Sequence, residues 1–193
     1  MKIRIAALAS AAVALVSAAS AAVETYSIDP VHSSVAFEIR HVFSKVPGKF
    51  TDFSGTITVD RENLEKSSVT ATIQVGSIDT SNEKRNSDLK APSFFDLAQY
   101  STITFTSTSW KKTGDNAYDV TGNLTIHGIT KEVVLKVIAD GFGPGMMGSP
   151  VSGWEATTTI NRRDYGVNGP AMLGTVVGDE VAISINIEAD LKK

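Results

Sequence analysis

Alternation of apolar and polar residues recurs along most of this chain and constrains its fold more than any other feature. In one stretch, Val35, Phe37 and Ile39 alternate with Glu38 and Arg40. Side chains of a β-strand point alternately to the two faces of a sheet, so a period of two indicates a half-buried strand. The pattern predicts a protein built from strands whose apolar side chains share one face.

The expected strands are separated by polar residues and turn-forming residues. They cover residues 33–43, 53–60, 68–75, 102–110, 118–126, 132–139, 154–160 and 181–189. Turn residues at 112–116 and 127–128 indicate hairpins, and a hairpin joins two antiparallel neighbours. An antiparallel arrangement of successive strands is typical of a β-barrel, so the sequence predicts an all-β fold.

Two segments depart from the strand pattern. Between residues 81 and 98, a charged stretch predicts a short helix that ends before Pro92. The second segment, from Gly141 to Gly153, is rich in Gly, Met and Pro, and we expect it to form a mobile flap near an opening of the barrel.

The interior of such a barrel can be filled or hollow. A barrel of about eight strands has room either for its own side chains or for a small ligand. Gly55, Ala71 and Ala156 are small residues on the inward face. These small residues fit a hollow barrel and the tapering interior of a filled barrel equally well. The alternation of apolar and polar residues therefore does not decide between a hollow and a filled barrel.

The N-terminus resembles an export signal. Lys2 and Arg4 precede an uncharged apolar run that ends in small residues, and we expect cleavage after Ala21. The apolar core is shorter than the roughly 20 residues that span a bilayer. We therefore expect residues 1–21 to be a cleaved signal peptide and residues 22–193 to form one domain in the periplasm or outside the cell, without stable membrane insertion.

Charge and cysteine content exclude several classes of function. The sequence has 18 basic and 21 acidic residues, and the expected leader carries two of the basic ones, so the mature net charge is about −5. Such a chain is not expected to bind nucleic acid electrostatically. With no cysteine, it cannot form disulfides or use a thiol nucleophile.

A hydrolase triad is conceivable from residue types alone, because Asp29, His32 and Ser33 lie close together in the sequence. Adjacent strand residues point to opposite faces, however, and no nucleophile elbow is present. Three histidines without an HExxH pattern give no metal motif. We expect no catalytic residues, no metal and no cofactor.

Several longer sequence blocks occur in one order along the chain. They are Asp29–Ser33, Arg40–His41, Gly48–Gly55, Ser77–Asn86, Leu89, Phe94–Asp96, Ile103–Phe105, Gly122–Lys131 and Ile160–Gly166. Together they resemble the YceI-like family of polyisoprenoid-binding proteins over essentially the whole mature chain. One departure is Asn86, at a position where the family usually has an acidic residue.

The resemblance implies a lipocalin-like, eight-stranded antiparallel β-barrel with one short helix between strands and an elongated apolar pocket. It further implies a non-enzymatic carrier of a polyisoprenoid, such as a prenyl quinone precursor or a polyprenyl phosphate. One alternative is a carrier of fatty acids or fatty amides, and another is an interaction or stress protein with a filled barrel. Related barrels also make a homodimer an option, although no interface signature is legible.

Candidate binding residues follow from the inward face. For the lipid tail they are Phe37, Ile39, Phe53, Ile57, Val69, Ile73, Phe94, Phe95, Ile103, Phe105, Leu124, Leu135, Trp154 and Ile160. For the headgroup they are His41, which continues the inward series, and Arg40, Arg85 and Arg163. An arginine can donate charge-assisted hydrogen bonds to a phosphate or phenol oxygen, and the alternative for each is an ion pair or a solvated face. Together with the family resemblance, this arrangement implies a tunnel with His41 at one end and Phe94–Phe95 as a lid.

Overall fold

The computed structural model describes residues 23–146 and 148–192, so the expected signal peptide lies outside the described residues. The strands are β1 Glu24–Ile28, β2 Ser34–His41, β3 Ser44–Phe50, β4 Phe53–Val59, β5 Ser68–Gln74, β6 Ile78–Asp79, β7 Thr102–Lys112, β8 Ala117–Ile126, β9 Ile129–Pro144, β10 Pro150–Asn161 and β11 Val177–Leu191. The helix α1 covers Glu83–Lys90, and the 3-10 turns are η1 Leu64–Lys66, η2 Val75–Ser77, η3 Arg162–Tyr165 and η4 Ala171–Thr175. No helix among the described residues is both long and apolar enough to cross a membrane.

These strands form one closed antiparallel barrel. Both β1 and β2 pair with β11, at successive positions along it, so they act as one interrupted strand. In the same way β3 continues into β4 and β5 into β6, because β3 pairs with β2 and β6 while β4 pairs with β1 and β5. The ring β1-β4-β5-β7-β8-β9-β10-β11 closes through the β1–β11 pairing. The predicted eight-stranded antiparallel barrel with one short helix is confirmed.

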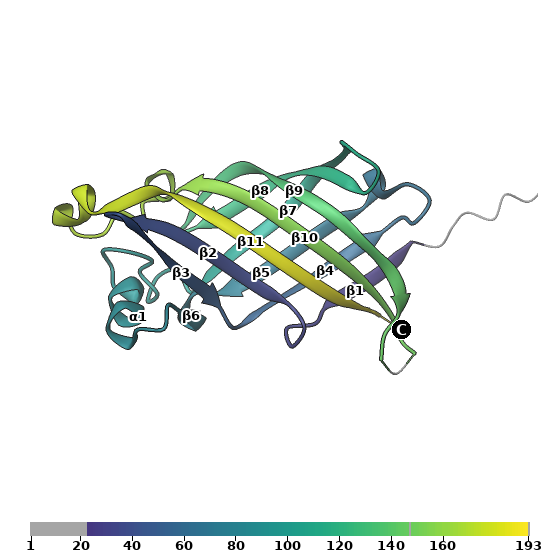
Figure 1. The fold of residues 1–193 in the computed structure, drawn as a ribbon, viewed down its shortest axis with the longest axis horizontal. Coiled ribbons are helices and arrows are strands. Elements are labelled where there is room, and N and C mark those ends of the chain that lie inside the picture. The colour runs from purple at the N-terminus through teal and green to yellow at the C-terminus, as the bar shows by residue number, and fades with distance from the viewer. Residues whose placement is uncertain (1–22, 147, 193) are drawn as a thin grey trace, which may run out of the picture.

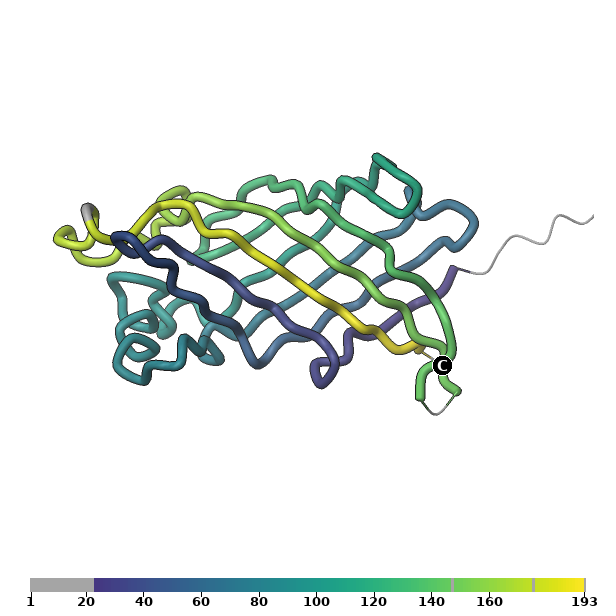
Figure 2. The backbone as a smooth tube through the Cα atoms, viewed as in Figure 1, coloured from purple at the N-terminus to yellow at the C-terminus, as the bar shows by residue number. Residues whose placement is uncertain are grey.

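The barrel is elongated, and its two ends differ (Figure 1). One end, which we call the α1 end, carries α1, β6 and the loops around η3 and η4. The other, which we call the terminal end, carries the C-terminus, the start of β1 and the β9–β10 turn. The backbone trace follows the strands obliquely around the barrel between these ends (Figure 2). Loops that are distant in sequence therefore meet at the α1 end.

Local sequence explains the single helix and the tight hairpins. Asn82 caps α1, because its side-chain Oδ1 accepts a hydrogen bond from the Arg85 amide at 2.9 Å. His127 and Gly128 both have positive φ, the geometry of a two-residue turn whose twist matches the flanking strands. The predicted helix and the predicted hairpin at 127–128 are confirmed.

Three strands were not predicted, namely β1, β3 and the two-residue β6. β1 is only five residues long, so its alternation is too brief to stand out. β3 contains Pro47 and Gly48, which usually argue against a strand. Pro47 is tolerated because β3 pairs with β6 only at Lys49 and Phe50, which leaves the outer edge of its first half without a described strand partner.

The predicted flap at Gly141–Gly153 is wrong in both structure and place. β9 continues to Pro144 and β10 begins at Pro150, and the two strands pair through most of this segment. The turn between them lies at the terminal end, which packed aromatic residues close. The glycine and proline content of this segment argued against strands. β9 and β10 are nevertheless extended here, because hydrogen bonds between the two strands hold them in that conformation.

The terminal end is closed by an aromatic plug, formed by Tyr26, Trp110, Phe142 and Trp154. The Trp154 ring makes edge-to-face contacts with Trp110 and Phe142, at centroid distances of 5.6 and 5.5 Å. Tyr26 is fully buried, and the centroid of its ring lies 6.0 Å from that of Phe142. The Arg61 guanidinium lies over the Phe142 ring, 4.5 Å from the ring centroid. Aromatic pairs of this geometry add to the stability that burial provides.

The interruption between β1 and β2 is anchored to β11 by side chains. The Ser33 hydroxyl donates to the Glu188 carbonyl and accepts from the Glu188 amide, in place of ladder bonds. Asp29 accepts a hydrogen bond from the Val31 amide and contacts His32 Nδ1 at 2.5 Å. These bonds hold the first interrupted strand in register with β11.

A close approach of two strands predicts a strong effect of Gly122→Ala. A Cβ atom at this position would lie 2.4 Å from the Phe105 ring and 2.6 Å from the Thr106 carbonyl oxygen. We expect Gly122→Ala to lower the free energy of unfolding by about 1–3 kcal/mol, measured by urea denaturation. Gly143→Ala is the matched control, because a Cβ atom there meets nothing within 4 Å. Equal stability of the two variants would contradict this packing.

The Asp29–His32 pair predicts a window of pH dependence. Asp29 raises the pKa of His32 above its ordinary 6.5, and the His32 side chain lowers the pKa of Asp29 below 3.8. The stabilisation from His32 is fully present below its unfolded pKa and is lost as pH rises through its folded pKa. That from Asp29 is present above its unfolded pKa and is lost as pH falls through its folded pKa. We therefore expect the difference in urea midpoint between the wild type and His32→Gln to be largest between about pH 4 and 6.5. A difference that does not change with pH would exclude this pair as its origin.

Candidate ligand cavity

The barrel is hollow. A cavity of about 730 Å³ runs inside it, and every strand contributes at least one side chain to its lining. This volume lies within the range of pockets that enclose small-molecule ligands. The structure thus decides between the filled and hollow barrels that the alternation left open.

The predicted tail-binding residues all line this cavity. They are Phe37, Ile39, Phe53, Ile57, Val69, Ile73, Phe94, Phe95, Ile103, Phe105, Leu124, Leu135, Trp154 and Ile160. Their shared position follows from strand alternation, which turns one face of each strand inward once the sheet closes. Their contact with a ligand stays a prediction.

The floor of the cavity lies against the aromatic plug. Trp110 and Trp154, the two tryptophans of the chain, line the cavity and belong to the buried cluster at the terminal end. Among the small residues, Ala71 and Ala156 line the space. Gly55 does not, because the Ile28 side chain occupies the position that its Cβ would take. Because Trp110 and Trp154 lie at the floor of the cavity, tryptophan fluorescence is a direct readout of a ligand that reaches it.

Polar lining residues are concentrated toward the α1 end. The set there is His41, Thr80, Arg85, Asp88, Ser93 and Arg162, and the two polar residues elsewhere in the lining are Ser54 and Thr158. The 80–101 segment packs on the loop after η3, because the Gly169 amide donates to the Ser93 carbonyl at 2.7 Å. Phe94 and Phe95 belong to this wall of the mouth, and their opening as a lid stays a prediction. The cavity is an apolar tunnel with a polar mouth.

Arg85 is the cation of the mouth that lacks a carboxylate partner among the described residues. Its Nε donates to Thr80 Oγ1 at 2.8 Å and its Nη2 to the Thr80 carbonyl at 2.7 Å. Asn86 in turn accepts hydrogen bonds from the Thr80 amide and hydroxyl. These contacts orient the half-buried guanidinium and leave its charge available to an anionic or polar ligand group.

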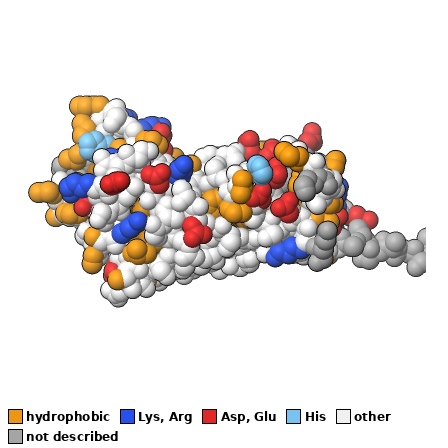
Figure 3. All heavy atoms as spheres, turned by 90° about the horizontal axis from the view of Figure 1, so that it is seen from below, with side chains coloured by type: hydrophobic (Ala, Val, Ile, Leu, Met, Phe, Trp, Pro, Cys, Tyr) orange, Lys and Arg blue, Asp and Glu red, His pale blue; other side chains and the backbone are white. Residues whose placement is uncertain are grey.

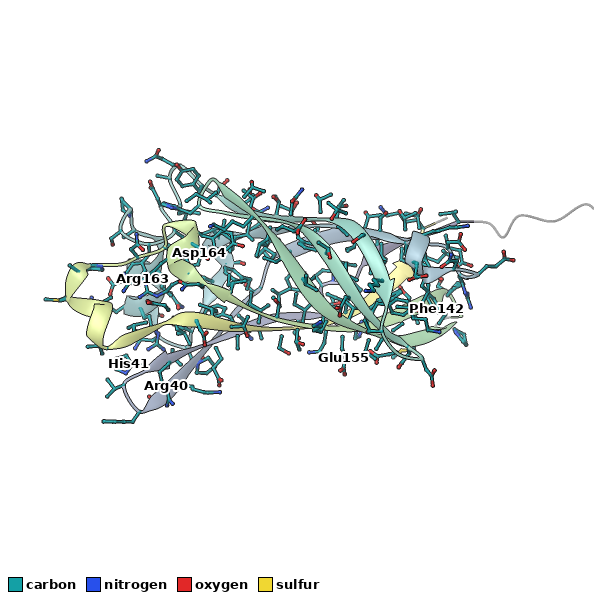
Figure 4. The ribbon with its side chains drawn as sticks, turned by 90° about the horizontal axis from the view of Figure 1, so that it is seen from above. Arg40, His41, Phe142, Glu155, Arg163 and Asp164 are labelled. Atoms are coloured by element: carbon teal, nitrogen blue, oxygen red, sulfur yellow. The ribbon has the colours of Figure 1, made fainter. Side chains whose placement is uncertain are left out.

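Two predicted headgroup residues lie outside the cavity lining. Arg40 is exposed, and its Nη1 donates to the Phe43 carbonyl at 3.2 Å. Arg163 pairs with Asp179, with Nε at 2.6 Å from Oδ1, which is the ion-pair alternative considered for it. Figure 4 shows both arginines and His41 at the same end of the barrel. Strand alternation turns Arg40 outward in β2, between the inward residues Ile39 and His41, whereas Arg163 lies in η3 after the end of β10 and is held by Asp179.

His41 lines the mouth and is exposed, at the end of β2. The expected inward series does not extend to Phe43, which is 94% exposed. β2 ends at His41, and Val42 and Phe43 form a two-residue turn, so strand alternation no longer applies there.

The sequence reasoning missed Arg162. Its side chain is buried, lines the cavity and donates hydrogen bonds to the carbonyls of Gly178, Val167 and Asn168 and to Asp179. Burial lowers the pKa of this guanidinium, although Asp179 opposes the shift. The signal was present, because Arg162 continues the inward series of β10 after Ile160. Its hydrogen bonds tie the loop after η3 to the start of β11 at the mouth.

A cluster of Asp29, His32 and Glu188 brings metal-ligating atoms within 4.8 Å of one another. None of the three lines the cavity. His32 Nδ1 contacts Asp29 and lies 3.9 Å from Glu188 Oε1, and the Ser33 hydroxyl bonds to the backbone of Glu188. This arrangement accounts for these residues as an anchor of the β1–β2 loop.

Comparison with known proteins places this geometry in a family. Residues 26–189 match the family described as YceI-like domain. The protein YceI of Salmonella arizonae is 37% identical over 180 residues, which cover 90% of this chain and 91% of that protein. Among solved structures, Burkholderia cenocepacia BcnA has a TM-score of 0.77 and 26% identity, covering 83% of this chain and 98% of the other. A polyisoprenoid binding domain from Saccharophagus degradans, implicated in plant cell wall breakdown, has a TM-score of 0.67 over 86% of this chain and 98% of the other. Its identity is 16%, so that likeness shows the fold alone.

Proposed function

Because this chain belongs to the YceI-like family, we propose that it is a non-enzymatic carrier that holds the tail of a polyisoprenoid lipid in its barrel. The observation that carries this proposal is the apolar tunnel, which is closed by the aromatic plug at one end and has a polar mouth at the other. An amphiphile with one long tail and one polar head matches that division. The Saccharophagus degradans domain, described as polyisoprenoid binding, supports the choice of lipid.

The tail enters first and reaches toward Trp110 and Trp154, and the head stays at the mouth beside Arg85. Burial of apolar surface contributes roughly 25 cal/mol for each Å², so a long tail binds without any polar contact inside the tunnel. Arg85 adds a charge-assisted hydrogen bond to a phosphate or phenol oxygen. The ligand class is a prenyl quinone precursor or a polyprenyl phosphate.

The place of action in this proposal is the periplasm. It rests on the basic, apolar and small-residue stretch at residues 1–21, which has the pattern of a cleaved signal peptide. A carrier there would move or store a lipid whose tail cannot cross water unaided. The principal alternative is a fatty acid or fatty amide in the same tunnel, which the same polar mouth would accept.

The proposal is tested by identifying the lipid that purifies with the folded protein. We expect organic extraction and mass spectrometry to give species that contain a repeated isoprene unit. Straight-chain species alone, in repeated preparations, would support the fatty-acid alternative and overturn the polyisoprenoid assignment. Protein without lipid that also fails to change its tryptophan fluorescence when undecaprenyl phosphate is added would overturn carriage altogether.

A second prediction concerns the headgroup. We expect Arg85→Gln to weaken binding of undecaprenyl phosphate about tenfold, because a hydrogen bond to a charged group contributes about 1.5 kcal/mol or more. Binding is followed by tryptophan fluorescence, and an uncharged prenyl hydrocarbon should bind both proteins alike. Arg163→Gln is the matched control, because this exposed arginine pairs with Asp179 and does not line the cavity. Equal losses in the two variants would remove Arg85 from the headgroup site.

A further inference from the structure

The mouth of the tunnel carries large apolar side chains that face solvent. Phe43 is 94% exposed, Met172 is 81% exposed and Val42 is 47% exposed. Val42 and Phe43 form the β2–β3 turn, and Met172 lies in η4. The two segments adjoin, because the Val42 amide donates to the Val176 carbonyl at 2.8 Å. We call Val42, Phe43 and Met172 the apolar tip.

The apolar tip is continuous with the inside of the tunnel. Met172 and the next residue, Leu173, line the cavity, although Met172 is mostly exposed. On the other segment, His41 lines the mouth directly before the turn. An apolar path therefore leads from the cavity lining to the outermost side chains of the α1 end, where η4 forms the extreme of the long axis (Figure 1).

The turn itself does not explain why these residues are apolar. Val42 has a φ of +49°, a conformation that is unfavourable for a β-branched residue and that Asn or Gly adopts readily. Phe43 contributes little to the packing of the barrel, because almost its whole side chain is in solvent. A polar turn would close this hairpin at lower cost, so the chemistry of the turn points to a role outside the fold.

We propose that the apolar tip is a docking surface for a lipid bilayer, through which the tunnel receives or releases its ligand. The inference rests on the proposed function, since it names the source of the carried lipid. Phe43 and Met172 would enter the interface between headgroups and acyl chains, which places the mouth against the membrane. The tail could then pass into the tunnel along the apolar side chains of Met172 and Leu173, while its head stays beside the polar residues of the mouth.

A bilayer fits this surface better than a second copy of the chain. Three side chains of this size expose on the order of 400 Å² together, about half of the roughly 800 Å² that each partner buries in a stable interface. Their position at the end of an elongated barrel also gives a narrow projection instead of a flat face. Figure 3 shows hydrophobic side chains at this end beside charged side chains of both signs, an arrangement suited to the zwitterionic headgroups and acyl chains of a bilayer together.

The test compares the apolar tip with exposed apolar residues elsewhere. The test variant is Val42→Asn combined with Phe43→Ser in the full mature chain, because these two residues of the apolar tip do not line the cavity and Asn adopts the positive φ of position 42 readily. The control is Val31→Ser combined with Met146→Ser, because these residues are 81% and 100% exposed and do not belong to the tip. Each protein is mixed with phosphatidylcholine vesicles that contain undecaprenyl phosphate, and its flotation with vesicles and the rate of tryptophan fluorescence change are measured. Uptake of the same lipid from an ethanol dispersion measures binding without a membrane.

We expect the tip variant to lose at least about tenfold in vesicle partition and in transfer rate, with uptake from the dispersion unchanged. The control should behave as the wild type. Equal behaviour of the tip and control variants would overturn the proposal. So would a tip variant that only dissociates a dimer in sedimentation, because the surface would then join two copies. Tip-dependent flotation without lipid uptake from either source would instead refute carriage and leave the docking surface standing.

Discussion

The closure of the sheet is the constraint on which the rest of this structure depends. β11 is long enough to pair with β10 on one side and with both β1 and β2 on the other. That pairing turns a meander into a ring, although the outer edge of the first half of β3 has no strand partner among the described residues. It also converts one apolar face per strand into a continuous interior surface. Without closure, the same side chains would form an exposed apolar face and not a tunnel.

The two ends of the barrel differ in structure, because one end closes the cavity and the other forms its mouth. Large aromatic side chains fill the terminal end, where Trp154 packs edge to face against its neighbours. At the α1 end a polar network around Arg162 joins the loop after η3 to the start of β11, because its guanidinium donates to backbone carbonyls of both. A buried charge of this kind is tolerated because its hydrogen bonds and Asp179 compensate for lost solvation. The result is a hydrogen-bonded polar rim at the mouth of the tunnel.

Strand alternation was sufficient to predict most of the cavity wall. Residues such as Phe37, Ile103 and Ile160 lie in long strands, where side-chain direction follows from sequence parity alone. The rule failed where the ladder stops: Phe43 falls in a turn and points to solvent. Arg162 was missed for the opposite reason, because parity placed it inward but its charge suggested the surface. Residues at strand ends depend on contacts between loops, which a periodic pattern does not contain.

The sequence by itself determined the class of fold and the face that each long strand turns inward, because those follow from a period of two along the chain. Membership of the family also follows from sequence, over residues 26–189. Only the tertiary structure decided that the barrel is hollow, which end is closed, and which arginine of the cavity lining has no carboxylate partner among the described residues. These properties depend on how much space the facing side chains leave and on which loops meet, and both arise from contacts between residues far apart in the chain.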